Sequence, residues 1–130
     1  MTVVDASVVV ELALSTPASG QIGRWLRTGA GTLHAPHLLD LEVAHAVRRM
    51  CLSGEVTTER GARALEILAG MALLRHPHGP LLSRIWELRH NLTAYDAAYV
   101  ALAEALGAML VTRDRRLARS RGHAAKVELV

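Results

Sequence analysis

Cysteines and aromatic side chains are scarce in this sequence. Cys51 is the only cysteine, which excludes an internal disulfide and leaves no cysteine cluster for zinc or an iron–sulfur centre. The chain has no phenylalanine, two tryptophans and two tyrosines, too few for a protein that reads RNA by stacking bases on aromatic rings. We therefore expect a cytoplasmic protein whose contacts with any nucleic acid are mainly to the backbone.

Long hydrophobic runs and low-complexity tracts are also missing. The apolar stretch at residues 67–74 is too short to cross a membrane, and the one at residues 97–112 is interrupted by Glu104. The first 14 residues contain Asp5 and Glu11 and no basic leader, unlike a signal peptide. Without a linker or a block of charge, residues 1–130 are expected to fold as one soluble domain with no membrane partner.

Arginine carries almost all of the positive charge. The formal net charge is +3, and of the 15 basic residues only Lys126 is not an arginine. The planar guanidinium group matches phosphate oxygens, which favours a polyanionic partner. A GC-rich genome would enrich arginine equally well, so the composition leaves both explanations open.

The spacing of apolar residues predicts short strands that alternate with helices. Strands are expected at residues 1–4, 32–35, 71–75, 109–112 and 126–130. Helices are expected at residues 6–14, 19–28, 38–52, 57 or 58–70, 81–90, 94–106 and 114–120, with a turn at 29–31 and a loop at 77–80. Apolar strands separated by helices are typical of a sheet buried on both faces. We predict an α/β fold of three layers, α/β/α, around a mainly parallel sheet of about five strands.

Acidic residues follow two of the predicted strands. Asp5 comes directly after the first strand, and Asp114 lies two residues past the strand at 109–112. Because the carboxyl ends of parallel strands meet at one edge of a sheet, we expect both carboxylates at that edge. Asp96 stands in the first turn of a helix, on the apolar stripe that includes Tyr99, and Glu42 opens another helix. These four acids are the candidate site, while Asp40 is interpreted as structural.

Each acid also has an ordinary structural explanation. Asp5 and Asp114 could cap helices, Asp96 could complete a Thr-x-x-Asp capping box, and Glu42 could be solvated helix surface. Ion pairing within a helix does not account for Glu42 or Asp96, since neither has a cation four residues further on. Carboxylates brought together at a partly buried edge repel one another, and a divalent cation is the common remedy. Oxygen ligands favour Mg²⁺, with Mn²⁺ as an alternative, and such ions support hydrolysis of a phosphodiester.

Hydroxyl and basic residues lie near these acids in the sequence. Ser7 and Thr112 could orient a carboxylate or a water at a metal site, or could be simple cap and strand residues. Arg113, Arg115 and Arg116 flank Asp114 and could contact RNA phosphates.

Two histidine pairs have spacings that zinc sites use. His34 with His37, and His76 with His78, sit beside proline-containing loops and lack a third ligand at a useful distance. We therefore do not expect a zinc site there.

The same residues carry a resemblance to a known family. The segments VVDAS at residues 3–7, APHLLDLEVAHAVRR at 35–49, NLTAYDAAYVALAEAL at 91–106 and LVTRDRRLA at 110–118 resemble, in order and spacing, the PIN-domain ribonucleases, specifically the VapC-type toxins of bacterial toxin–antitoxin pairs. The resemblance covers essentially the whole chain. It implies a PIN-like fold and a single PIN domain at residues 1–130.

The resemblance also implies a chemistry and partners. Asp5, Glu42, Asp96 and Asp114 would form a catalytic site for Mg²⁺-dependent endonucleolytic cleavage of RNA. Asp5 and Asp96 would bind the metal directly, and the other two acids directly or through water. A homodimer and inhibition by a cognate VapB-like antitoxin are expected. Some relatives carry a further acid where this chain has Arg115 and Arg116, so the occupancy of a second metal site stays open.

Other classes of protein fit the sequence less well. A phosphoaspartate phosphatase would need an acid at the position of Ser7, and a receiver domain would need an aspartate between Asp40 and Asp96. The alternative from another class is a non-catalytic module that keeps the fold for dimer and antitoxin contacts. The presence of all four acids favours the enzyme.

Overall fold

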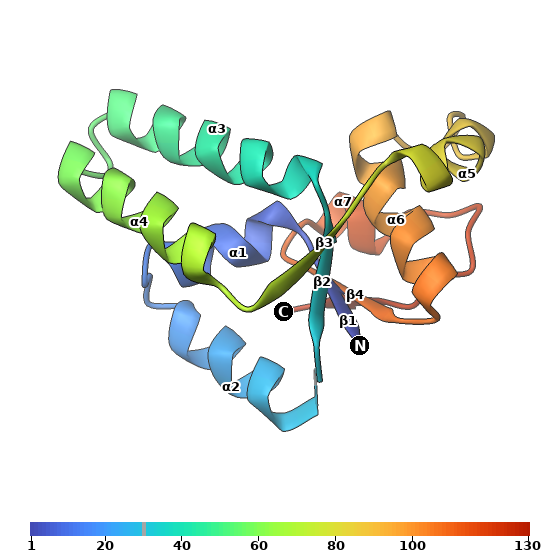
Figure 1. Ribbon diagram of the computed structural model, residues 1–130, viewed down its shortest axis with the longest axis horizontal. Helices are drawn as coiled ribbons and strands as arrows, with labels where there is room; N and C mark the ends of the chain where they lie inside the picture. Colours follow the sequence, from blue (N-terminus) through green and yellow to red (C-terminus); the bar gives the residue numbers. More distant parts are fainter. Residues whose placement is uncertain (30) are drawn as a thin grey trace.

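A five-stranded parallel sheet forms the centre of the protein. The structure, a computed structural model, describes residues 1–29 and 31–130 (Figure 1). The strands are β1 (Thr2–Val4), β2 (Leu33–Pro36), β3 (Leu73–His76), β4 (Met109–Thr112) and β5 (Val127–Leu129). They are ordered β3-β2-β1-β4-β5, and every neighbouring pair is parallel. The predicted parallel sheet is confirmed.

Helices cover both faces of this sheet. The helices are α1 (Ala6–Ala13), α2 (Ser19–Gly29), α3 (Leu38–Leu52), α4 (Thr58–Gly70), the 3₁₀ turn η1 (Gly79–Leu81), α5 (Leu82–Glu87), α6 (Ala94–Leu106) and α7 (Arg115–Ala118). Figure 1 shows α1 to α4 on one side of the sheet and α5 and α6 on the other. The three-layer α/β/α arrangement is therefore as predicted. In the described part of the chain, no helix is long and apolar enough to cross a membrane.

The core lies around the two central strands and α6. Val3, Val4, Leu110 and Val111 are fully buried, as expected for parallel strands that helices cover on both faces. Every residue of α6 from Ala97 to Ala103 is buried, because small alanines let this helix approach the sheet closely. Thr93 caps the start of α6, and Gly107, with a φ of 58°, ends it in the left-handed conformation that glycine favours.

Several predicted boundaries were wrong. The helix expected at 81–90 is α5, Leu82–Glu87, preceded by η1 in the segment predicted as a loop at 77–80. After Glu87 the chain tightens into i→i+3 turns, in which Arg89 N donates to Trp86 O and Asn91 N to Leu88 O.

Smaller shifts occur at the ends of several other elements. The strand expected at 71–75 begins later, at Leu73, because Met71 caps α4 and accepts from the Leu73 N–H. The strand at 126–130 and the helix at 114–120 are shorter, as β5 and α7. The turn expected at 29–31 includes Ala30, which lies outside the described residues.

A close approach of α3 and α4 depends on Gly61. A Cβ at this position would lie 2.6 Å from Cys51 Sγ and 3.2 Å from Val47 Cγ1. We predict that Gly61→Ala lowers the free energy of unfolding by about 1–3 kcal/mol, because the two helices must separate. Gly70→Ala in the same helix is the matched control, since its Cβ would meet nothing within 4 Å, and no loss is expected. Urea denaturation measures both, and equal stability of the two variants would contradict the prediction.

Candidate active site

The four acids named by the sequence line one open cleft. Asp5 follows β1, Asp114 follows β4, Glu42 lies on α3 and Asp96 lies in the first turn of α6. Together they line a cleft of about 1210 Å³. Since β1 and β4 are parallel neighbours, with Val4 paired to Val111, Asp5 and the segment after β4 come together at the carboxyl edge of the sheet.

Asp5 is held in place by protein donors on both carboxylate oxygens. Its Oδ1 accepts the Ser7 hydroxyl at 2.6 Å and the Val8 N–H at 3.2 Å, which makes Asp5 the N-cap of α1. Its Oδ2 accepts the hydroxyl of Thr112. The side chain is buried, at 6% exposed. Burial raises the pKa of Asp5, and the hydrogen bonds from Ser7 and Thr112 offset only part of that rise.

Ser7 and Thr112 connect Asp5 to the segment that carries Asp114. The Ser7 Oγ accepts the Arg113 N–H at 2.8 Å, and the Thr112 Oγ1 accepts the Asp114 N–H at 2.9 Å. Both hydroxyls thus orient the Asp5 carboxylate while they fix the loop after β4. Neither residue is a simple cap or strand residue in this structure.

The Thr112 hydroxyl is expected to matter for stability. Thr112→Val keeps the shape but leaves Asp5 Oδ2 without its donor and the Asp114 N–H without its acceptor. We predict a loss of about 1–3 kcal/mol in the free energy of unfolding. Thr112→Ser, which keeps the hydroxyl and loses only a methyl group, is expected to cost less. Chemical denaturation checks this, and a Val variant more stable than the Ser variant would contradict it.

Glu42 is bonded to a tyrosine of α6. The Tyr99 hydroxyl donates to Glu42 Oε1 at 2.7 Å, and Tyr99 itself is 2% exposed. Burial raises the pKa of Glu42, and the negative charges of Asp96 and Asp5 raise it further against the effect of the Tyr99 bond. Burial, together with the neighbouring Glu42 charge, also raises the pKa of Tyr99. The apolar stripe predicted for this helix includes Tyr99 but does not predict its contact with Glu42. The available signal is the spacing, because Tyr99 lies three residues after Asp96 and therefore on the same face of the helix.

Asp96 and Asp114 influence each other across the cleft. Burial raises the pKa of Asp96, the charge of Asp114 raises it further, and Arg116 opposes the rise. The Asp96 N–H donates to Thr93 Oγ1 at 3.2 Å, in the first turn of α6. Asp114 caps α7 by accepting the Arg116 N–H at 2.8 Å, and the Arg116 guanidinium lies 3.6 Å from Asp114 Oδ2. The capping roles considered for Asp5 and Asp114 therefore exist together with their place in the cleft.

The cleft contains the carboxylate oxygens that a hard cation such as Mg²⁺ prefers as ligands, although these oxygens do not converge on one point. In residues 1–29 and 31–130 no three His, Cys, Asp or Glu side chains stand close enough to hold a metal ion as they are. The neighbouring negative charges nevertheless raise the pKa of Glu42 and of Asp96, so the carboxylates repel one another. An oxygen-only set of mutually repelling acids fits Mg²⁺ or Mn²⁺ better than softer metals.

Asp40, His34, His76 and His78 do not line the cleft, whereas His45 does. Asp40 pairs with Arg75 of β3 at 2.8 Å and does not line the cleft, in agreement with its structural interpretation. His34 Nδ1 lies 2.8 Å from His76 Nε2, with the two rings stacked, and His78 Nε2 accepts the Leu38 N–H at the start of α3. The side chains of His34, His76 and His78 thus join β2, the strand β3 and the start of α3.

The three arginines after β4 differ in how far other residues engage their side chains. Arg113 lies 3.5 Å from Glu11 and donates to the Val130 carbonyl, so it is partly engaged. The side chain of Arg116 is 88% exposed, and Arg115 is also exposed at the surface of α7. All three stand beside Asp114, at the edge of the sheet where the acids gather.

Comparison with known proteins identifies similar chains over nearly the full length. The PIN domain family model matches residues 2–122. Ribonuclease VapC1 of Mycobacterium tuberculosis is 46% identical over 129 residues, which cover 98% of this chain and 96% of the relative. Ribonuclease VapC12 of the same species is 42% identical over 130 residues, covering 100% of this chain and 99% of that protein.

Solved structures share the fold. PAE2754 from Pyrobaculum aerophilum superposes with a TM-score of 0.69 at 30% identity, covering 97% of this chain and 82% of the other. VapBC2 from Rickettsia felis, solved with a DNA fragment from its promoter, gives a TM-score of 0.73 at 16% identity, covering 98% and 97%. At that identity the second likeness concerns the fold alone.

Proposed function

Because the chain belongs to the PIN-domain family, among its VapC-type toxins, we propose that the cleft is the active site of an endoribonuclease that hydrolyses RNA phosphodiester bonds with Mg²⁺. The relatives that cover nearly the whole chain are named as ribonucleases. The observation that carries the proposal is the gathering of Asp5, Glu42, Asp96 and Asp114, from four separate elements, along one cleft. Mn²⁺ would serve in place of Mg²⁺.

Asp5 and Asp96 are the proposed direct ligands of the cation. Asp5 is oriented by Ser7 and Thr112, and its Oδ2, with one hydroxyl bonded, has room for a second partner. Glu42 and Asp114 would bind directly or through water, after small rotations of their partly exposed side chains. When bound, the ion would polarise a phosphoryl oxygen and lower the pKa of a water. The charge of the four acids is what the ion would compensate, and their positions would set where the phosphate lies.

Arg113, Arg115 and Arg116 are proposed to contact RNA phosphates beside the acids. For Arg115→Gln we expect weaker RNA binding at every sequence and a slope of log K against log salt that is smaller by about 1. The matched control is Arg24→Gln, an exposed arginine on α2, away from the cleft. Filter binding at several salt concentrations measures the affinity and the salt slope of both variants. Both carry Asp96→Asn as well, which is expected to prevent cleavage of the RNA during the measurement. An identical salt slope in the two variants would remove Arg115 from the RNA surface.

An antitoxin is the proposed protein partner, and the active form is proposed to be a homodimer. The solved structures similar to this chain include a toxin–antitoxin complex from Klebsiella pneumoniae and the Rickettsia felis VapBC2 assembly. The cleft is lined by apolar side chains of α3 next to the acids, among them Leu38 and Leu41, the latter 76% exposed. A VapB-like peptide that covers this surface would block access of RNA to the acids.

Cleavage of RNA by the purified chain tests the proposal. We expect cleavage of a mixed RNA pool with Mg²⁺, loss of cleavage with EDTA, and recovery when Mg²⁺ or Mn²⁺ is added back. Co-expression with a cognate VapB-like antitoxin should suppress both cleavage and toxicity. Cleavage that continues in EDTA would overturn the metal mechanism. No cleavage of any RNA, with antitoxin binding retained, would identify a non-catalytic binding module.

A further inference from the structure

The contact between Tyr99 and Glu42 joins three elements of the cleft. The Tyr99 side chain comes from α6, Glu42 from α3, and the backbone of Ala6, directly after Asp5, also interacts with the phenol. Tyr99 is 2% exposed, so its hydroxyl has little access to water. The acceptor of this buried hydroxyl is one of the four acids. A buried phenol requires only a hydrogen-bond acceptor, and a backbone carbonyl could have served. The use of Glu42 instead also fixes the position of a carboxylate.

Glu42 depends on this one partner. Within residues 1–29 and 31–130, the phenol is its only hydrogen-bonding side chain, and no cation pairs with it. Its Oε1 is engaged by the phenol, whereas no protein donor is bonded to Oε2. The two oxygens are therefore unequal before any ion arrives.

This inequality decides how Glu42 can bind a cation. Two-oxygen binding would place the cation on Oε1 as well, beside the phenol proton that points at this oxygen, and we expect their repulsion to weaken such binding on the order of tenfold. One-oxygen binding through Oε2 leaves the phenol satisfied. Mg²⁺ and Mn²⁺ favour octahedral sites with single-oxygen ligands, whereas Ca²⁺ takes more ligands and accepts two-oxygen carboxylates.

We propose that Tyr99 is a positioning residue that keeps Glu42 as a one-oxygen ligand and thereby selects small divalent cations over Ca²⁺. It acts through Glu42 and does not touch the ion or the RNA. The inference rests on the proposed function, because it requires a cation in this cleft.

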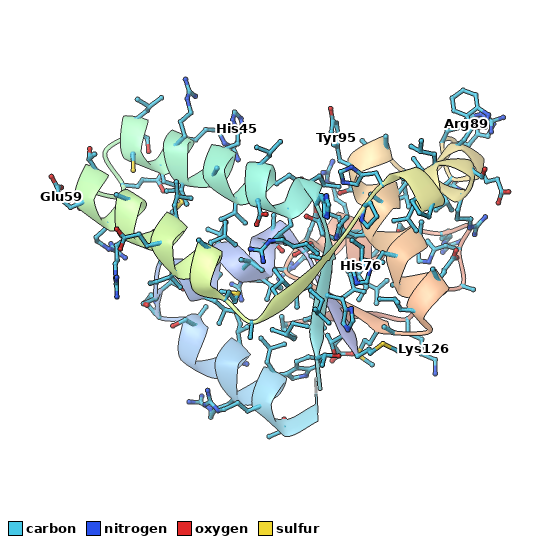
Figure 2. All side chains as sticks on the ribbon, viewed as in Figure 1. His45, Glu59, His76, Arg89, Tyr95 and Lys126 are labelled. Atoms are coloured by element: carbon cyan, nitrogen blue, oxygen red, sulfur yellow. The ribbon has the colours of Figure 1, made fainter. Side chains whose placement is uncertain are left out.

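Cation binding by the metal-free protein tests this without measuring activity. Mn²⁺ affinity is measured by electron paramagnetic resonance or calorimetry, and Ca²⁺ affinity by competition. For Tyr99→Phe we expect the ratio of Mn²⁺ to Ca²⁺ affinity to fall about tenfold. Tyr95→Phe is the matched control, since Tyr95 lies on the same helix and also lines the cleft, but is 66% exposed and points outward in Figure 2. Its ratio should equal that of the wild type.

A double-mutant cycle shows whether Tyr99 acts through Glu42. In a Glu42→Gln background the Tyr99→Phe substitution should no longer change the ratio, because the carboxylate it positions is gone. If Tyr99→Phe leaves the ratio of Mn²⁺ to Ca²⁺ affinity unchanged in the protein that retains Glu42, the inference is overturned and the proposed function stays intact. Failure of the wild type to bind Mn²⁺ at all would overturn both.

A second measurement covers the case in which Tyr99→Phe does not fold. In the Tyr95→Phe protein Tyr99 is the only tyrosine, so 3-fluorotyrosine labels this position alone. The more acidic fluorophenol is a stronger donor to Glu42, and we expect the Mn²⁺ to Ca²⁺ ratio to rise above that of the unlabelled protein. A ratio that stays the same or falls would overturn the inference.

Discussion

Asp5→Asn is expected to lower the rate of RNA cleavage by about a thousandfold while leaving the metal-free fold about as stable as the wild type. The loss of rate follows from removing a proposed direct ligand, since a bound cation contributes several kcal/mol to such a reaction. The stability follows from the burial that raises the pKa of Asp5, because the folded state then disfavours the charge. An amide of the same shape removes this cost but replaces one acceptor oxygen by an N–H donor, so a hydroxyl of Ser7 or Thr112 loses its acceptor, and the two effects, each about 1–3 kcal/mol, are expected largely to offset each other.

A matched substitution separates the site from the fold. Asp40→Asn makes the same chemical change at an aspartate that pairs with Arg75 and does not line the cleft. Its cleavage rate should stay within about a factor of two of the wild type, because distant sites act independently. Single-turnover cleavage and chemical denaturation are measured on both variants. A large loss of stability in Asp5→Asn would mean that the Asp5 carboxylate is mainly a structural acceptor for the hydroxyls of Ser7 and Thr112, and full activity would remove it from the chemistry.

The part of the site that follows from topology could be predicted from local sequence. Asp5 and Asp114 come after short apolar strands, and parallel strands bring their carboxyl ends to one edge. The caps of α6 at Thr93 and Gly107 are equally local signals, and the structure has both. Glu42 reaches the cleft by a different route, since its position depends on how α3 packs relative to α6.

Contacts between distant side chains were not predictable from periodicity. The bond between Tyr99 and Glu42 spans 57 residues, and a tyrosine in an apolar stripe is otherwise typical of a core position. Another contact of this kind joins Arg84 of α5 to Glu104 of α6 at 2.7 Å and to the Gly122 carbonyl at 3.5 Å. Such pairings fix short irregular segments, and helical spacing of leucines carries no information about them.

The stabilisation by Mg²⁺ is expected to grow as the pH rises from about 4, through the raised pKa values of the acids, to about 8. Burial and neighbouring charges raise the pKa of Asp5, Glu42 and Asp96 above their ordinary values of 3.8, 4.5 and 3.8. A cation binds the ionised carboxylates, so protons compete with it in this range. At a free Mg²⁺ concentration about 100 times the dissociation constant, binding would add about 2.7 kcal/mol to the free energy of unfolding. Below the raised pKa values most of this increment is lost.

The metal-free protein should show the opposite trend from the same three acids. A raised pKa in the folded state means that folding binds protons, so the contribution to stability is fully present below the ordinary pKa and is lost as the pH rises through the raised value. The acids therefore destabilise the metal-free fold at neutral pH, where a cation would stabilise it most.

Thermal unfolding with and without Mg²⁺ at each pH measures this, and the difference between the two curves is the informative quantity. Ionisable groups outside the cleft contribute equally to both curves and cancel in the difference. In Asp5→Asn the difference should be small at every pH, because a ligand is missing. A Mg²⁺ increment that is constant from about pH 4 to 8 would show that the cation does not bind at these carboxylates, since no proton would then compete with it.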